Sequence, residues 1–235
     1  MKKGFTLAEV LITLVIIGVI AAITIPSLIA KYQKEQFVSQ YKKAFNTVAQ
    51  AIQMSQAVNG QLDSWDYENI STLPEFSEKY LVPYFRIIKN CKTELNRDCF
   101  ANVTYKYLNG NNWFNPNKTE RYRFVLNDGM SVYIASYSQT GCITTPTNCF
   151  SLWVDINGKK GPNQAGRDFF GFSAFPFVNK IVPDGTMKYP SIYHPETKTY
   201  ERQTKEEILE NSCGATKNGA GCGALIILDG YQMNY

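Results

Sequence analysis

The sequence of 235 residues contains a single histidine, His194, and none of its six cysteines forms a Cys-x-x-Cys pair. Protein zinc sites are built from closely spaced Cys and His ligands, so zinc is poorly supported. No Ser/His/Asp or Cys/His arrangement of a nucleophilic enzyme stands out either. We therefore expect a protein that is not an enzyme, and we expect His194, between Tyr193 and Pro195, on the surface.

Concentrated positive charge is also missing. The formal net charge is only +4, and no run of Lys or Arg is longer than a pair. Nucleic acid is thus a disfavoured partner, although a Lys/Arg cluster formed in the folded chain would reopen that possibility. The 44% hydrophobic and 14% aromatic content argues against long disordered stretches.

One long stretch, residues 10–30, has no charge at all. About 20 apolar residues span a bilayer as a helix. Lysines flank this stretch on both sides, so the positive-inside rule does not settle its orientation. A cleaved secretory signal has a shorter apolar core and a small-residue cut site, and this segment has neither. A plain membrane anchor fits the length of the stretch, but it does not explain the acidic residue Glu9 directly before it.

Glu9 is the one acidic residue at the entrance of this apolar stretch. A carboxylate within a membrane segment is costly and is functional by default. Glu9 could instead lie in the headgroup layer, but that leaves the preceding K-G-F-T-L unexplained. K-G-F-T-L-A-E followed by an apolar run resembles the type III signal of the type IV pilin superfamily.

The resemblance implies specific processing. Prepilin peptidase would cut between Gly4 and Phe5 and methylate the new N-terminus at Phe5. Glu9 would then lie four residues from a positive amine, on the same helical face. The resemblance further implies that Glu9 pairs with the amine of a neighbouring subunit during assembly, which agrees with the strength of ion pairs in apolar surroundings.

Gly18 and Pro26 interrupt the apolar stretch, and both are poor helix formers. In pilin-like filaments the helix between such positions can melt. An ordinary kink of a membrane helix is the alternative.

The implied function is that of a structural subunit in a type IV pilus-like filament. Its partners would be further copies of itself, other pilins, prepilin peptidase and an inner-membrane assembly platform. The chain would cross the bacterial inner membrane once, with its head in the periplasm or outside, before joining an extracellular or periplasmic filament. A pseudopilin of a type II secretion system is the second interpretation. A minor or competence pilin that binds DNA or a surface is the third.

Helical periodicity continues beyond the apolar stretch, and Asn59-Gly60 is a plausible helix end. The predicted stripe is Phe37, Tyr41, Ala44, Phe45, Val48, Ala51 and Ile52. A helix from Phe5 to Asn59 would be roughly 80 Å long. We therefore expect a leader peptide at 1–4, a membrane and filament-core half-helix at 5–30, an amphipathic half-helix at 31–59 and a globular head at 60–235.

The head has the pattern of an antiparallel β-meander, so the predicted class is α+β, with the long helix packed on the meander as in pilins. Predicted strands cover 101–108, 121–126, 130–137, 150–156, 167–175 and 224–228, with a turn at 127–129. Predicted short helices cover 74–81 and the stretch after Thr204, whose hydroxyl and Glu207 form a capping-box pattern.

Six well separated cysteines favour disulfides in an oxidising compartment, with buried free thiols as the alternative. Fifteen connectivities exist for six cysteines. A cysteine-closed segment near the C-terminus is familiar from many pilins. We predict pairing between neighbours in sequence: Cys91 with Cys99, Cys142 with Cys149, and Cys213 with Cys222.

The stretch V-D-I-N-G-K-K-G-P-N-Q-A-G-R-D resembles a glycine-rich loop found after a core strand in many pilins and pseudopilins. Asp155, Asn157 and Asp168 could supply oxygen ligands to calcium. The alternative is a hairpin loop in which these side chains stabilise local turns. The loop lacks EF-hand spacing, and Lys159 and Lys160 would repel a cation. No other cofactor is expected.

Overall fold

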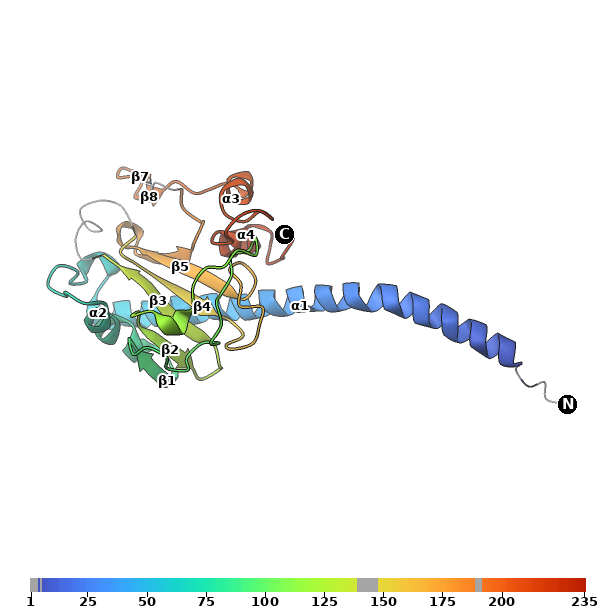
Figure 1. Ribbon diagram of the computed structural model, residues 1–235. Coiled ribbons are helices and arrows are strands. Elements are labelled where there is room, and N and C mark those ends of the chain that lie inside the picture. Colours follow the sequence, from blue (N-terminus) through green and yellow to red (C-terminus); the bar gives the residue numbers. More distant parts are fainter. Residues whose placement is uncertain (1–3, 5, 139–147, 189–191) are drawn as a thin grey trace. The chain divides into compact units, whose positions relative to one another are not determined.

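A computed structural model describes residue 4 and residues 6–138, 148–188 and 192–235 (Figure 1). The chain divides into two compact units, Met1–Gln36 and Phe37–Tyr235. Helix α1, Leu7–Asn59, contributes to both units.

In the first unit, α1 carries apolar side chains that are exposed around the helix, among them Leu7, Ile17 and Leu28. In the described part of the chain, α1 is the one helix long and apolar enough to cross a membrane. The hydroxyls of Thr13 and Thr24 donate hydrogen bonds to backbone carbonyls one turn earlier. Such bonds satisfy polar side chains in surroundings without water.

In the second unit, α1 buries one face, which confirms the predicted stripe. Its buried residues are Tyr41, Ala44, Val48, Ala51, Ile52 and Ser55. The helix ends at Asn59, as predicted, and Gly60 follows with φ +85°. A Cβ at Gly60 would lie only 2.6 Å from Ser64 Oγ. Glycine therefore suits this position both because φ is positive and because no side chain would fit.

A six-stranded antiparallel sheet forms the centre of the second unit, with the strand order β1-β2-β3-β4-β5-β6 (Figure 1). The strands are β1 (Ile87–Lys92), β2 (Arg123–Leu126), β3 (Ser131–Tyr137), β4 (Phe150–Asp155), β5 (Phe169–Phe175) and β6 (Lys180–Pro183). A separate pair, β7 (Tyr193–His194) and β8 (Thr199–Tyr200), follows. The predicted meander and its turn at 127–129 are thus confirmed, and the chain has the α+β arrangement of pilins.

Both faces of the sheet are covered, which explains why the central strands β4 and β5 are buried almost continuously. Alternate residues such as Val132, Leu152 and Phe172 join the core that contains the α1 stripe. Their neighbours Tyr133 and Trp153 belong to a second cluster, with Phe100, Ala101, Tyr105 and Phe169. The alternation follows from the two-residue period of a strand.

The segment 101–108 is not a strand, so that prediction is wrong. Its backbone donors bond to three different segments: Tyr105 N–H to Phe114, Lys106 N–H to Asn163 and Leu108 N–H to Asn218. A β-ladder would need a single partner strand. The segment is instead an irregular cover over the second face of the sheet, with Tyr105 fully buried.

Three further α-helices lie in the described part of the second unit. Helix α2, Leu73–Tyr80, has proline in its first turn and agrees with the prediction. Helix α3, Lys205–Asn211, starts with the predicted Thr204/Glu207 capping box. The predicted strand at 224–228 is wrong, because these residues lie in helix α4, Cys222–Leu228.

The error at α4 has a physical cause. A short apolar run fits a buried helix as well as a strand. Here a disulfide ties the first residue of α4, Cys222, to Cys213 just after α3. The run pairs with none of the described strands, and a helix satisfies its backbone groups internally. Leu225 and Ile226 are buried against the core.

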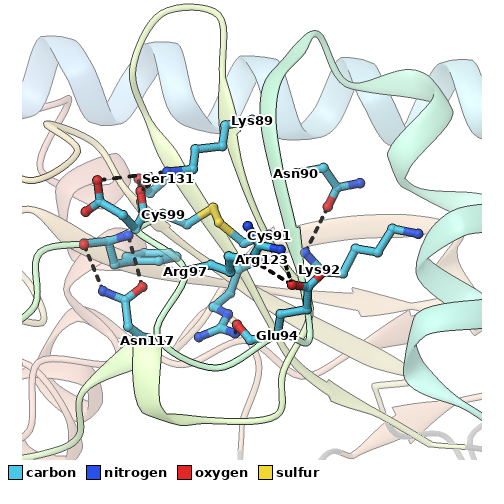
Figure 2. Close-up of a disulfide and its surroundings, with 12 residues drawn as sticks. Lys89, Asn90, Cys91, Lys92, Glu94, Arg97, Cys99, Asn117, Arg123 and Ser131 are labelled. Atoms are coloured by element: carbon cyan, nitrogen blue, oxygen red, sulfur yellow. Dashed lines mark hydrogen bonds and ion pairs between the residues drawn. A yellow bond between two sulfur atoms is a disulfide. The ribbon is translucent and has the colours of Figure 1, made fainter.

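Disulfides join Cys91 to Cys99 and Cys213 to Cys222, two of the three predicted pairs. Cys142, one member of the third pair, lies outside the described residues. Arg123 is fully buried and lies near the first disulfide, where its Nη2 donates to the Glu94 carbonyl at 2.6 Å (Figure 2). Its Nη1 donates to the Pro116 carbonyl at 2.5 Å. Arg123 therefore fastens two loops to strand β2.

We predict that Arg123→Ala lowers the free energy of unfolding of the full chain by about 3 kcal/mol, because two carbonyls lose charged donors and a cavity opens. Arg121→Ala is the matched control. It removes the same side chain from an exposed position nearby and should change stability by less than about 0.5 kcal/mol. Urea denaturation followed by near-UV circular dichroism measures both, and equal effects would contradict the role of Arg123.

Candidate functional site

The first candidate site is the start of α1. Thr6 precedes the helix, and Glu9 lies in its first turn. The Thr6 backbone N–H and hydroxyl both donate to Glu9 Oε2 at 2.8 Å. The Glu9 N–H donates back to Thr6 Oγ1 at 3.3 Å. These reciprocal bonds form a capping box, which satisfies donors that a helix N-terminus otherwise leaves free.

This role of Thr6 was not predicted, although the Thr-x-x-Glu spacing is its sequence signature. In the described part of the chain Glu9 Oε1 accepts no hydrogen bond, and the residue is exposed. The carboxylate thus caps its own helix through one of its two oxygens. Gly4 is also exposed, with no atom within 4 Å of a Cβ built there, and Phe5 lies outside the described residues.

Helix α1 is continuous across Gly18 and Pro26. No atom lies within 4 Å of a Cβ built at Gly18. The Ser27 hydroxyl donates to the Thr24 carbonyl at 2.8 Å, beside the proline that cannot donate a backbone bond. Melting between Gly18 and Pro26 stays a prediction.

The second candidate site is the loop between β4 and β5. Asp155 ends β4, and Asp168 directly precedes β5. Both carboxylates are fully buried. Asp168 accepts from the N–H groups of Asn163 (2.8 Å) and Gln164 (2.7 Å) and from Asn157 Nδ2 (3.3 Å). The structure therefore brings together the three residues that the sequence singled out.

Asp155 is held from the other side of the loop. The Tyr105 hydroxyl donates a short hydrogen bond to Asp155 Oδ2, and the Asn157 N–H donates to Oδ1 at 3.3 Å. Burial raises the pKa of Asp155 well above its usual range, and the charge of Asp168 raises it further. Burial also raises the pKa of Asp168, to about 6, although its backbone donors oppose the shift.

Oxygens suited to a hard cation gather in this loop. Besides the two carboxylates, Asn157 Oδ1 and Asn163 Oδ1 are buried without a hydrogen-bond partner in the described residues. Lys159 forms an ion pair with Asp98. Calcium prefers carboxylate and amide oxygens, so the donor set fits it. The hydrogen bonds above also satisfy the carboxylates without a metal, so calcium stays a prediction.

The raised pKa of Asp168 predicts a pH-dependent stability. Because the folded chain holds this proton more tightly than the unfolded chain, the contribution to stability is complete below about pH 4 and is lost as pH rises through about 6. Relative to Asp168→Asn, the unfolding free energy of wild type should fall by up to about 3 kcal/mol over that range. Asp63→Asn, at an exposed carboxyl, is the control, and parallel curves for wild type and Asp168→Asn would contradict the prediction.

Calcium binding predicts that about 1 mM calcium raises the melting temperature of the wild-type chain at pH 7.5. Asp168→Asn should abolish this rise, and magnesium at the same concentration should not reproduce it. An unchanged melting temperature in wild type would remove calcium from the interpretation of this loop.

Two protein-family models together match almost the whole chain. Residues 1–25 match the prokaryotic N-terminal methylation motif, and residues 27–234 match a family described as "Family of unknown function (DUF6613)". No curated protein and no solved structure matches. The motif covers the predicted leader, the predicted cleavage position and Glu9, and it is the signal of type IV pilin-like and pseudopilin precursors. The chain therefore belongs to family DUF6613 and, through its methylation motif and long N-terminal helix, to the type IV pilin and pseudopilin superfamily.

Proposed function

We propose that this protein is a structural subunit of a type IV pilus-like filament, polymerised through the first half of α1. The observation that carries the proposal is the methylation motif at residues 1–25 on an exposed apolar helix. Prepilin peptidase cuts between Gly4 and Phe5 and methylates Phe5. The inner-membrane assembly platform then passes the helix from the membrane into the filament, where it meets further copies and other pilins.

Helix packing supplies most of the assembly energy in this proposal. The large apolar side chains of the first unit are about 40% to 80% exposed, with Val10 at 42% and Leu7 at 79%. In the membrane, lipid covers them. In a filament, neighbouring helices cover them and leave no apolar surface in water.

Glu9 sets the register of that packing. Its Oε1, which accepts no hydrogen bond among the described residues, accepts from the methylated Phe5 amine of the neighbouring subunit, while Oε2 remains with Thr6. An unpaired charge in the apolar filament core would be costly, so a subunit shifted along the axis is disfavoured. The role is that of a structural protein, with no catalytic step.

The disulfides support a location of the head outside the cytoplasm. Cys91–Cys99 and Cys213–Cys222 both lie in the second unit, and disulfides persist in oxidising compartments. The precursor would thus cross the inner membrane once, with the head in the periplasm. The assembled subunit would lie in a filament outside the cell or in the periplasm.

A pseudopilin of a type II secretion system is the second candidate, because it shares the same motif.

We predict that filaments sheared from the cell surface contain this chain as a main component, beginning with N-methylated Phe5. Mass spectrometry of the N-terminal peptide measures this. A processed chain that stays with the envelope would favour the pseudopilin, and an assembled chain beginning at Met1 would contradict the processing proposed for Phe5.

Two substitutions separate the charge of Glu9 from its capping role. Glu9→Gln keeps a side chain that can complete the capping box but removes the charge, and Glu9→Val removes both. We predict that both variants are cleaved normally and that both lower filament yield at least tenfold. Glu35→Gln, at an exposed glutamate farther along α1, should assemble normally. Normal yield from Glu9→Gln, measured by quantitative immunoblotting of sheared filaments, would show that the ion pair is not required.

A further inference from the structure

The second unit contains a hollow beside β6 that neither the motif nor the proposed assembly uses. Its volume is about 320 Å³. It lies next to the edge strand of the sheet, between the turn Pro176–Val178 and strand β8. The lining residues are Phe177, Val178, Asn179, Lys180, Val182, Met187, Lys198, Thr199, Tyr200 and Arg202.

Three cations surround this hollow, and no acidic residue lines it. Lys180, Lys198 and Arg202 are all exposed, and none of them forms an ion pair in the described part of the chain. The neighbouring carboxylate of Glu201 is already bound by Lys188 (3.3 Å) and His194 (3.1 Å). The uncompensated positive charge therefore favours an anionic ligand.

Aromatic rings form the wall of the same hollow. Phe177 is half-buried and packs edge-on against Tyr193, with ring centroids 5.0 Å apart. Tyr200 packs in the same way against Phe175 at 4.9 Å. The Tyr200 hydroxyl is buried and has no hydrogen-bond partner in the described residues, which is unusual for a native structure.

We propose that the hollow binds a nucleotide unit of a single-stranded nucleic acid. A base packs against Phe177 and the apolar wall, and the flanking phosphates lie against Lys180, Lys198 and Arg202. Proteins that hold single strands combine these two features, a cationic groove and aromatic rings on which bases stack. A duplex hides its bases in the stack, so it would use only the charges.

The combination of groups distinguishes a nucleic acid from a simple anion. Inorganic phosphate or an anionic polysaccharide would be attracted to the three cations but would gain little from Phe177 and Val182. This interaction needs no assembled filament, so oligonucleotide binding by the single chain can be measured whether or not the proposed polymerisation is correct.

The experiment measures fluorescence polarisation of a labelled oligothymidylate of about 12 nucleotides with the full chain in neutral detergent. Lys198→Gln/Arg202→Gln should weaken binding at least tenfold and reduce the slope of log affinity against log salt concentration by about 1.4. The control, Arg121→Gln/Lys160→Gln, removes the same charge from exposed positions away from the hollow and should bind like wild type. Equal losses in the two double variants would overturn the proposal.

Substitutions of Phe177 test the stacking. Phe177→Leu should weaken binding at least fivefold with an unchanged salt slope, and Phe177→Tyr should restore it. Polyphosphate, which has charge but no bases, should compete poorly. Strong competition by polyphosphate together with normal binding by Phe177→Leu would overturn the proposal in favour of a general polyanion site. A wild-type chain that does not bind the oligonucleotide would overturn it outright.

Discussion

The packing of α1 on the sheet is the contact on which the second unit depends, and Tyr41 lies at its centre. The Tyr41 ring is 4.7 Å from Phe170, and its hydroxyl donates to the Gly223 carbonyl at 2.8 Å. One side chain thus joins three elements: α1, β5 and α4. A Cβ on Gly223 would lie 2.9 Å from that hydroxyl, so α4 can approach so closely only because glycine is present.

The sequence predicts those parts of the fold whose periodicity is unambiguous. Strands β2 to β5 alternate clearly, and their two sides face different clusters. The α1 stripe follows a clear helical period and joins one of these clusters. The edge strands were not predicted. β1 exposes Ile88 and Lys89, and β6 is only four residues long, so neither shows a clear alternation. The segment 101–108 does alternate, but its backbone bonds are divided among three partners.

The candidate sites also differ in how far the sequence alone predicts them. The methylation motif is contiguous, so Gly4, Phe5 and Glu9 can be predicted as processing and assembly residues from the sequence alone. Only the hydrogen bonds between Thr6 and Glu9 required the structure. In the β4–β5 loop, the sequence places Asp155 and Asp168 near each other, but the donation from Tyr105 comes from fifty residues earlier. The positive charge around the hollow could not be predicted from runs of Lys and Arg in the sequence, because Lys180 lies far in sequence from Lys198 and Arg202.

The candidate residues of the two units are therefore brought together in different ways. In the first unit the predicted processing and assembly residues, Gly4, Phe5 and Glu9, lie within six positions of one another in the sequence. In the second unit every candidate group depends on the sheet. The β4–β5 loop is set by the hairpin register that pairs Asp155 with Phe169, and the hollow is set by the edge at β6. We therefore expect changes to the loops after β6 to alter the proposed binding at the hollow without altering the methylation motif at residues 1–25.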